Sequence, residues 1–192
     1  MCASCASFPD TCGSVPDEVK SMSLPSKFDH DLRNQLKKRL RAYEWTTQSR
    51  VSKETRECVD VAGELVCAGP RRTRPVLIEA ELKREDPVSN VLKVWRHALK
   101  GGYPMGFIFI QGFSRVYRSQ KYPTRRIRGE CAIQFGKMMA DSMKKVAYIP
   151  IRIRYLPRSG SNEGNGARRN AAVRFGNAIV TRLRATKTPS GK

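Results

Sequence analysis

The sequence predicts an α/β (α+β) fold in which a mixed central sheet is flanked by helices. Three observations support this fold class. Segments with helical spacing alternate with short runs of β-branched and aromatic residues. Three candidate strands follow one another closely enough to form an antiparallel meander. The third is followed by a helix and then an apolar run, which is the order of a right-handed parallel crossover.

The length of 192 residues, with 40% hydrophobic side chains, suffices for one domain with a substantial core. We expect a Cys/Ser/Pro-rich disordered tail over residues 1–25 and an α/β domain over residues 26–157. A Gly/Ser-rich flexible linker is expected at 158–166, followed by a basic C-terminal helix and tail over 167–192.

The first expected element is a helix over residues 28–43. Its apolar stripe has helical spacing and consists of Leu32, Leu36, Leu40 and Tyr43. Acidic residues near its start and basic residues near its end suit the helix dipole. The sequence does not fix where this helix ends between Tyr43 and Ser52.

Residues 57–68 predict a β-hairpin with a two-residue turn at Ala62-Gly63. Such a turn places Cys58 opposite Cys67, and a disulfide between them is geometrically conceivable. Two free thiols are the expected state, because a chain without a secretory signal belongs to a reducing compartment.

The second helix is expected to begin at Asp86-Pro87, with Asp as the N-cap and Pro at the first helical position. Gly101-Gly102 ends it. Its polar positions are Asn90, Lys93, His97 and Lys100. His97 is interpreted as a helix-surface residue. Asn90 and Lys93 are interpreted as part of a solvated face, and the alternative is that they face the strand expected at residues 76–83. Residues 105–111 then form a short apolar strand of the kind buried inside a sheet.

The remaining chain predicts three further elements after a polar connection at residues 114–128. These are a helix over 129–145, a strand over 146–156 and a last helix over 167–185. The strand is expected at the sheet edge, because Pro150 has no N–H to donate to a neighbouring strand.

The strand expected at residues 76–83 carries an acidic pattern. Alternate side chains point to opposite faces, so one face is apolar and the other carries Glu79, Glu81 and Lys83. Carboxylate oxygens are ligands that Mg²⁺ prefers, and a nearby lysine can polarise a water or steady a phosphoryl oxygen. The alternative is a solvated strand face with weak ion pairs.

An acidic residue on a hairpin, then Glu-x-Lys on the next strand, then a helix and an apolar strand resembles the PD-(D/E)xK nuclease superfamily. Restriction endonucleases and Holliday-junction resolvases belong to it. The resemblance covers roughly residues 28–111 and implies a restriction-endonuclease-like αβββαβ core. Glu81 and Lys83 match the Glu-x-Lys pair, and Asp60 matches the upstream aspartate, with Val59 in place of proline.

This resemblance implies a metal-dependent endonuclease that hydrolyses phosphodiester bonds of DNA. Asp60 and Glu81 would hold Mg²⁺, with Mn²⁺ able to substitute, and Glu79 would be a further or outer ligand. The metal would activate a bound water, and Lys83 would orient that water and stabilise developing charge. Glu44, expected at the end of the first helix, matches an acidic residue that some members use.

The formal charge of +20 predicts a polyanionic partner, DNA or RNA, and no membrane span is visible. The nuclease resemblance favours DNA over RNA as that partner. Phosphate contacts without sequence specificity are expected from the basic connection and the last helix. The candidates are Arg115, Arg118, Lys121, Arg125, Arg126, Arg128, Arg168 and Arg169. We expect a cytoplasmic protein, and the sequence leaves open whether it acts as a homodimer.

Two other functions remain open at this point. The same scaffold suits a non-catalytic module that holds nucleic acid, and the charge also suits a basic structural protein of a nucleoprotein particle.

Overall fold

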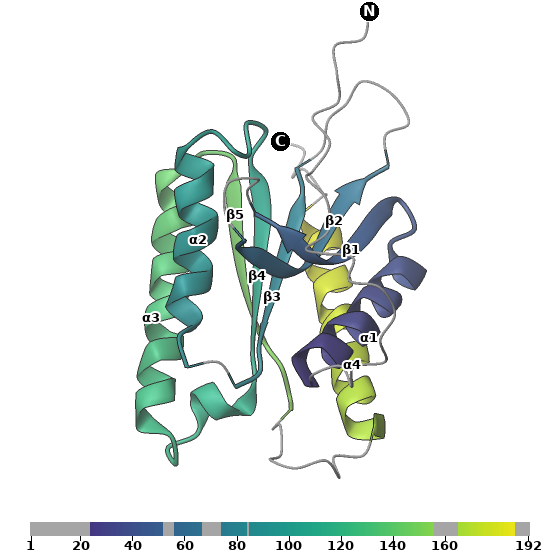
Figure 1. Cartoon of the computed structure of the whole chain (residues 1–192), viewed down its shortest axis with the longest axis vertical. Coiled ribbons are helices and arrows are strands. Elements are labelled where there is room, and N and C mark those ends of the chain that lie inside the picture. The colour runs from purple at the N-terminus through teal and green to yellow at the C-terminus, as the bar shows by residue number, and fades with distance from the viewer. Residues whose placement is uncertain (1–23, 52–55, 67–73, 84, 156–164, 187–192) are drawn as a thin grey trace, which may run out of the picture.

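The computed structural model describes residues 24–51, 56–66, 74–83, 85–155 and 165–186. They form three layers, with a sheet between two pairs of helices (Figure 1). In chain order the elements are α1 (Leu24–Arg39), β1 (Tyr43–Arg50), β2 (Cys58–Leu65), β3 (Val76–Glu81), α2 (Pro87–Leu99), β4 (Phe107–Phe113), the 3₁₀ helix η1 (Arg115–Arg118), α3 (Pro123–Ser142), β5 (Val146–Arg152) and α4 (Asn165–Ala185).

The sheet has five strands in the order β1-β2-β3-β4-β5. The first three are antiparallel, whereas β3, β4 and β5 are parallel, so the expected mixed sheet is confirmed. The expected parallel crossover through α2 is also present. Every residue of β3 and β4 is buried, and β5 lies at the edge, where Pro150 is tolerated.

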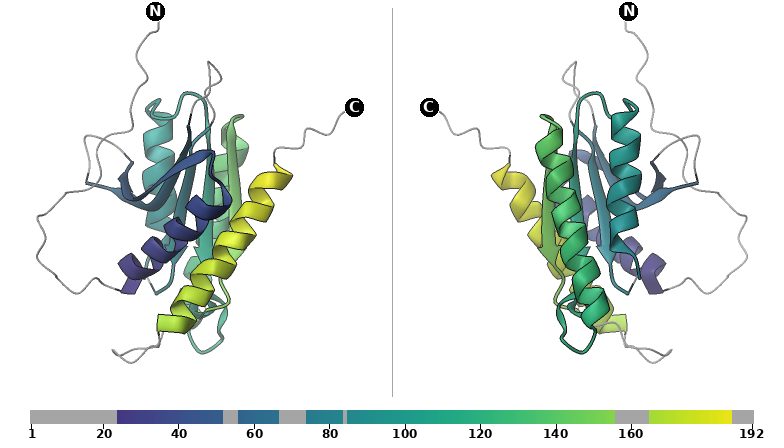
Figure 2. Two further views of the ribbon diagram at one scale, coloured as in Figure 1. Left: turned by 90° about the vertical axis from the view of Figure 1, so that its right-hand side faces the viewer. Right: turned by 90° about the vertical axis from the view of Figure 1, so that its left-hand side faces the viewer.

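Each face of the sheet has its own hydrophobic core. One core lies beneath α1 and α4 and includes Leu32, Ile78 and Phe175. The other lies beneath α2 and α3 and includes Leu77 and Val91. Figure 2 shows α4 and α3 on opposite sides of the sheet. Among the described helices, none is both long enough and apolar enough to cross a bilayer.

The expected hairpin turn at Ala62-Gly63 is wrong. Both residues lie inside β2, where Ala62 pairs with Thr46 and Gly63 pairs with Trp45. A Cβ on Gly63 would lie 2.5 Å from the Trp45 ring, so glycine is needed here for close packing and not for a turn. The partner of β2 is therefore β1, which the sequence analysis assigned in part to the first helix.

Two other expectations need correction. Cys58 is disulfide-bonded, so a free thiol there is wrong; its expected partner Cys67 lies outside the described residues. The third helix begins at Pro123, six residues before the expected start at 129. Proline at a first helical position is favourable because its missing N–H has no partner in the helix.

Candidate functional site

The candidate site lies where β2 and β3 separate. The last paired residues of the two strands are Val61 and Ile78, and Asp60 is the neighbour of Val61 on the unpaired side. Beyond this point the Asp60 carboxylate accepts a hydrogen bond from the Ala80 backbone N–H at 2.8 Å. Asp60 thus replaces the missing strand acceptor and is held between the two β3 residues Glu79 and Glu81. It is only 2% exposed.

Glu79 forms a buried ion pair with Lys93 of α2. The Lys93 ammonium lies 2.5 Å from a Glu79 carboxylate oxygen. It also donates to the Cys58 carbonyl at 2.5 Å and to Asn90 Oδ1 at 2.8 Å. Since an ammonium has three N–H donors, Lys93 is fully engaged and joins β2, β3 and α2 at one point.

Glu81 is fixed by amides from two other elements. Its Oε1 accepts hydrogen bonds from Asn90 Nδ2 at 2.7 Å and from Gln111 Nε2 at 2.8 Å. Gln111 in turn accepts from the Tyr148 hydroxyl at 2.9 Å. Burial and the Glu81 carboxylate raise the pKa of Tyr148, so its hydroxyl stays protonated and can act as this donor.

Lys83 lies two residues beyond Glu81. Leu82, the residue between them, belongs to the core beneath α1 and α4. Lys83 is half-buried, and its ammonium makes no hydrogen bond or ion pair with any described residue. Lys83 therefore differs from Lys93, because its amine is not engaged by the described part of the chain.

Local sequence signals position the α2 residues. The Asp86 carboxylate accepts from the Val88 N–H at 3.1 Å and the Ser89 N–H at 3.4 Å, which confirms the expected N-cap. Pro87 occupies the start of the helix, and its carbonyl accepts from Gln111 at 2.9 Å. The cap thus sets where the first turn begins, and that turn directs Asn90 at Glu81.

The interpretation of Asn90 and Lys93 as solvent-exposed is wrong. They are 4% and 9% exposed, respectively. Gln111, which is fully buried, was not recognised as a functional candidate. Its sequence signal was available, because it is a polar residue within the otherwise apolar strand β4.

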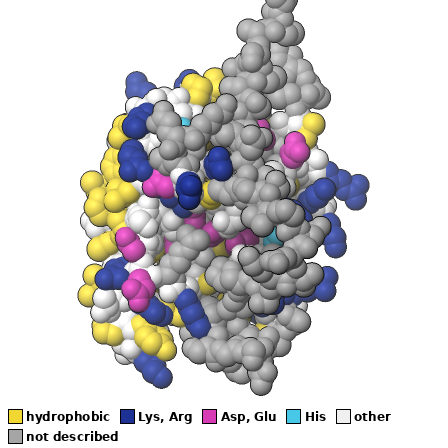
Figure 3. All heavy atoms as spheres, in the orientation of Figure 1, with side chains coloured by type: hydrophobic (Ala, Val, Ile, Leu, Met, Phe, Trp, Pro, Cys, Tyr) yellow, Lys and Arg dark blue, Asp and Glu magenta, His cyan; other side chains and the backbone are white. Residues whose placement is uncertain are grey.

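The expected nucleic-acid contacts fall into two groups. Arg115 and Arg118 lie on η1, and the group continues through Lys121 into the first turns of α3, with Arg125, Arg126 and Arg128. Arg168 and Arg169 lie in the first turns of α4, in the layer on the other side of the sheet. On the face in Figure 3, Lys and Arg side chains are spread around the edge of the molecule, and acidic side chains also lie on this face.

Several of these basic residues also have structural contacts. Arg168 forms a 3.1 Å ion pair with Asp31 and thereby joins α4 to α1. Arg128 donates to the Glu85 carbonyl at 2.7 Å. The Arg125 guanidinium lies 5.7 Å from the centre of the Tyr122 ring.

Glu44 does not join the candidate site. It lies on β1, opposite Glu64 of β2, and Glu64 is four residues from Asp60, or about 13 Å along a strand. Burial, with the Glu44 carboxylate second, raises the pKa of Glu64.

Glu44→Gln should therefore increase stability at pH 7. A raised pKa means that the folded state binds its proton more tightly, so Glu64 lowers the stability as pH rises from about 4.5 through the raised value. Removing the Glu44 charge should shrink this loss by a few tenths of a kcal/mol, as expected for opposed like charges. Urea unfolding at pH 4 and pH 7 measures the difference in unfolding free energy between Glu44→Gln and wild type. An equal difference at both pH values would contradict the electrostatic cause.

The donor chemistry of the site suits a hard divalent cation, since Asp60, Glu79 and Glu81 supply carboxylate oxygens from neighbouring strands. Within the described ranges, however, no three His, Cys, Asp or Glu side chains are gathered into a metal-binding group. Each carboxylate is instead turned towards a donor of the protein itself.

Comparison of the chain with protein-family models, with curated proteins and with solved structures finds no match.

Proposed function

We propose that this protein is a metal-dependent endonuclease that hydrolyses phosphodiester bonds of DNA. The observation that supports this proposal best is the hydrogen bond from the Ala80 N–H to Asp60, because Ala80 is the β3 residue between Glu79 and Glu81. The three acidic residues match the acidic positions of the PD-(D/E)xK resemblance. The charge of +20 supports a nucleic-acid substrate.

In this proposal Asp60 and Glu81 hold Mg²⁺, with Glu79 as a further or outer ligand. The metal, when bound, supplies an activated water and neutralises charge on the phosphate. Asn90 and Gln111 hold the Glu81 carboxylate in place by two hydrogen bonds. The amine of Lys83, which no described residue engages, would orient the attacking water and stabilise charge that develops on the phosphate.

A second candidate is a nucleic-acid-binding module without catalysis. It is favoured by the fact that each buried carboxylate already accepts a hydrogen bond or ion pair from the chain. Such contacts stabilise the charges without any metal. In that case the network is structural, and the basic surface alone performs the function.

Incubation of supercoiled plasmid with the protein, in Mg²⁺ and in EDTA, separates the two candidates. The nuclease should convert the plasmid to nicked circles in Mg²⁺ and leave it intact in EDTA. Lys83→Ala should lower this rate by about 10²-fold or more, the range for removing one transition-state donor. Lys137→Ala, at an exposed lysine of α3, is the control. Binding of the plasmid without cleavage in Mg²⁺ would support the second candidate.

A further inference from the structure

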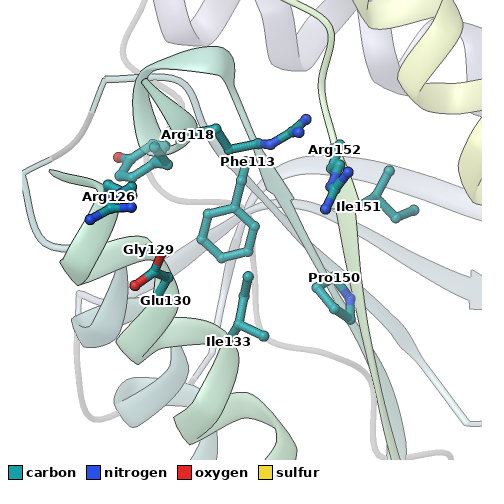
Figure 4. Close-up of a pocket in the computed structure, with 10 residues that line it drawn as sticks. Phe113, Arg118, Arg126, Gly129, Glu130, Ile133, Pro150, Ile151 and Arg152 are labelled. Atoms are coloured by element: carbon teal, nitrogen blue, oxygen red, sulfur yellow. The ribbon is translucent and has the colours of Figure 1, made fainter. Parts of the chain in front are cut away.

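A second feature on the same face of the sheet is a cavity of about 380 Å³, here called the arginine pocket. It lies between η1, the start of α3 and the end of β5 (Figure 4). Its lining is Phe113, Tyr117, Arg118, Arg126, Gly129, Glu130, Ile133, Pro150, Ile151 and Arg152. Its volume is within the range of sites that bind small organic molecules.

The charges of the pocket point to an anionic ligand. Arg118, Arg126 and Arg152 come from three separate elements, and only Glu130 opposes them. In Figure 4 the side chain of Arg118 extends towards β5, on which Arg152 lies. None of the three guanidinium groups donates to a described residue. Their mutual repulsion would be relieved by an anion, and guanidinium groups bind phosphate through paired hydrogen bonds.

The floor of the pocket is apolar. Phe113, Ile133 and Pro150 line the pocket below Arg118 and Arg152 in the view of Figure 4. Inorganic phosphate alone would leave this floor in contact with water. A ligand with a phosphate at one end and a flat or apolar group at the other would cover both parts.

The position of the pocket connects it to the candidate site. Glu81, Phe113 and Arg152 are partners in one row across β3, β4 and β5. Two strand spacings separate Glu81 from Arg152, which is about 10 Å between their Cα atoms. Successive nucleotides of one duplex strand rise by about 3.4 Å, so one strand can reach both places.

We infer that the arginine pocket binds a nucleotide of the nucleic-acid strand, a few positions from the phosphate at the candidate site. The phosphate lies between Arg118 and Arg152, and the base or sugar packs on the floor. This inference rests on the proposed function for its role, although binding itself needs no cleavage. It assigns Arg152, which the sequence analysis did not select, to the same ligand as Arg118.

The test measures binding of a labelled single-stranded oligonucleotide by fluorescence anisotropy in EDTA, where no metal-dependent cleavage occurs. Arg118→Ala/Arg152→Ala is compared with Arg174→Ala/Arg182→Ala, which removes two exposed arginines of α4 on the other side of the sheet. The pocket variant should bind about tenfold or more weakly than the control, because it can no longer form hydrogen bonds to a charged phosphate. The slope of log affinity against log salt should become shallower by about 0.7 for each phosphate that the variant no longer neutralises.

Competition identifies the ligand class. A deoxynucleoside 5′-monophosphate should displace the oligonucleotide from the wild-type protein at lower concentration than inorganic phosphate does, and this difference should vanish in the pocket variant. Equal competition by the two anions would overturn the assignment to a nucleotide. Circular dichroism checks that both double variants are folded.

The outcomes separate this inference from the proposed function. Equal loss of affinity in both double variants overturns the pocket, even if the wild-type protein cleaves plasmid. A selective loss in the pocket variant supports the pocket, even if plasmid remains intact in Mg²⁺.

Discussion

Glu81→Gln is expected to abolish metal-dependent cleavage while the protein stays folded. Glutamine has nearly the same shape, and its amide oxygen can still accept the hydrogen bonds from Asn90 and Gln111. The substitution removes the negative charge that would hold a divalent cation. Because a catalytic metal contributes several kcal/mol to the barrier, the nicking rate should fall by at least about 10²-fold.

The matched control is Glu85→Gln, which makes the same change in charge at an exposed position near the site. It should cleave at close to the wild-type rate. Nicking of plasmid under single-turnover conditions gives the rate, and thermal unfolding monitored by circular dichroism gives the stability of each variant. If the Glu81→Gln protein cleaves as fast as wild type, Glu81 does not hold a catalytic metal.

Lys93→Met is expected to have the largest effect on stability. The substitution leaves the fully buried Glu79 carboxylate without its ammonium partner. It also removes the donor to the Cys58 carbonyl and to Asn90. Removing one member of a buried ion pair costs about 3–5 kcal/mol, so unfolding should shift to markedly lower urea concentration at pH 7.

The double variant Glu79→Gln/Lys93→Met tests this cause. It removes both charges, so it should recover a large part of the lost stability. In Lys93→Met alone, burial should raise the pKa of Glu79 above its unfolded value, so the deficit should shrink as pH falls through that raised pKa. Lys137→Met, at an exposed site, should change stability by less than about 0.5 kcal/mol. A double variant as unstable as Lys93→Met would contradict this explanation.

The sequence was sufficient for the order of elements from β3 onwards and for the parallel crossover. The periodicity of the apolar residues in α2 and β4, together with the Asp86-Pro87 cap, depends only on local chemistry. Such signals are readable because each residue acts on its own neighbours in the chain.

The pairing of β1 with β2 was not predictable in the same way. Ala62-Gly63 is a favourable turn sequence, and only the Trp45 ring packed against Gly63 shows why glycine stands there. The start of α3 was missed because three arginines in its first turns oppose the helix dipole. Here Pro123 and tertiary packing decide the boundary.

The acidic residues of the candidate site were visible in the sequence, whereas the orientation of Asn90 and Lys93 towards them was only the less favoured of two interpretations. A helical pattern shows that Asn90 and Lys93 lie on a polar side of α2. The helical pattern does not show that β2 separates from β3 beneath that side of α2. Nor does it show that Glu79 and Glu81 are buried there and need partners from α2. The contacts of Lys93 span residues 58–93, and those of Gln111 span 81–148, so they depend on the assembled sheet.

The packing of α4 on α1 has a consequence for biosynthesis. Translation releases the N-terminal helix first, whereas Phe175 and Ile179, which complete the core over α1, emerge with the last described element. In a nascent polypeptide that lacks α4, apolar residues on that side of the sheet remain exposed to water, and such surfaces are prone to aggregation. Native structure is therefore expected to form only once nearly all of the described chain has left the ribosome.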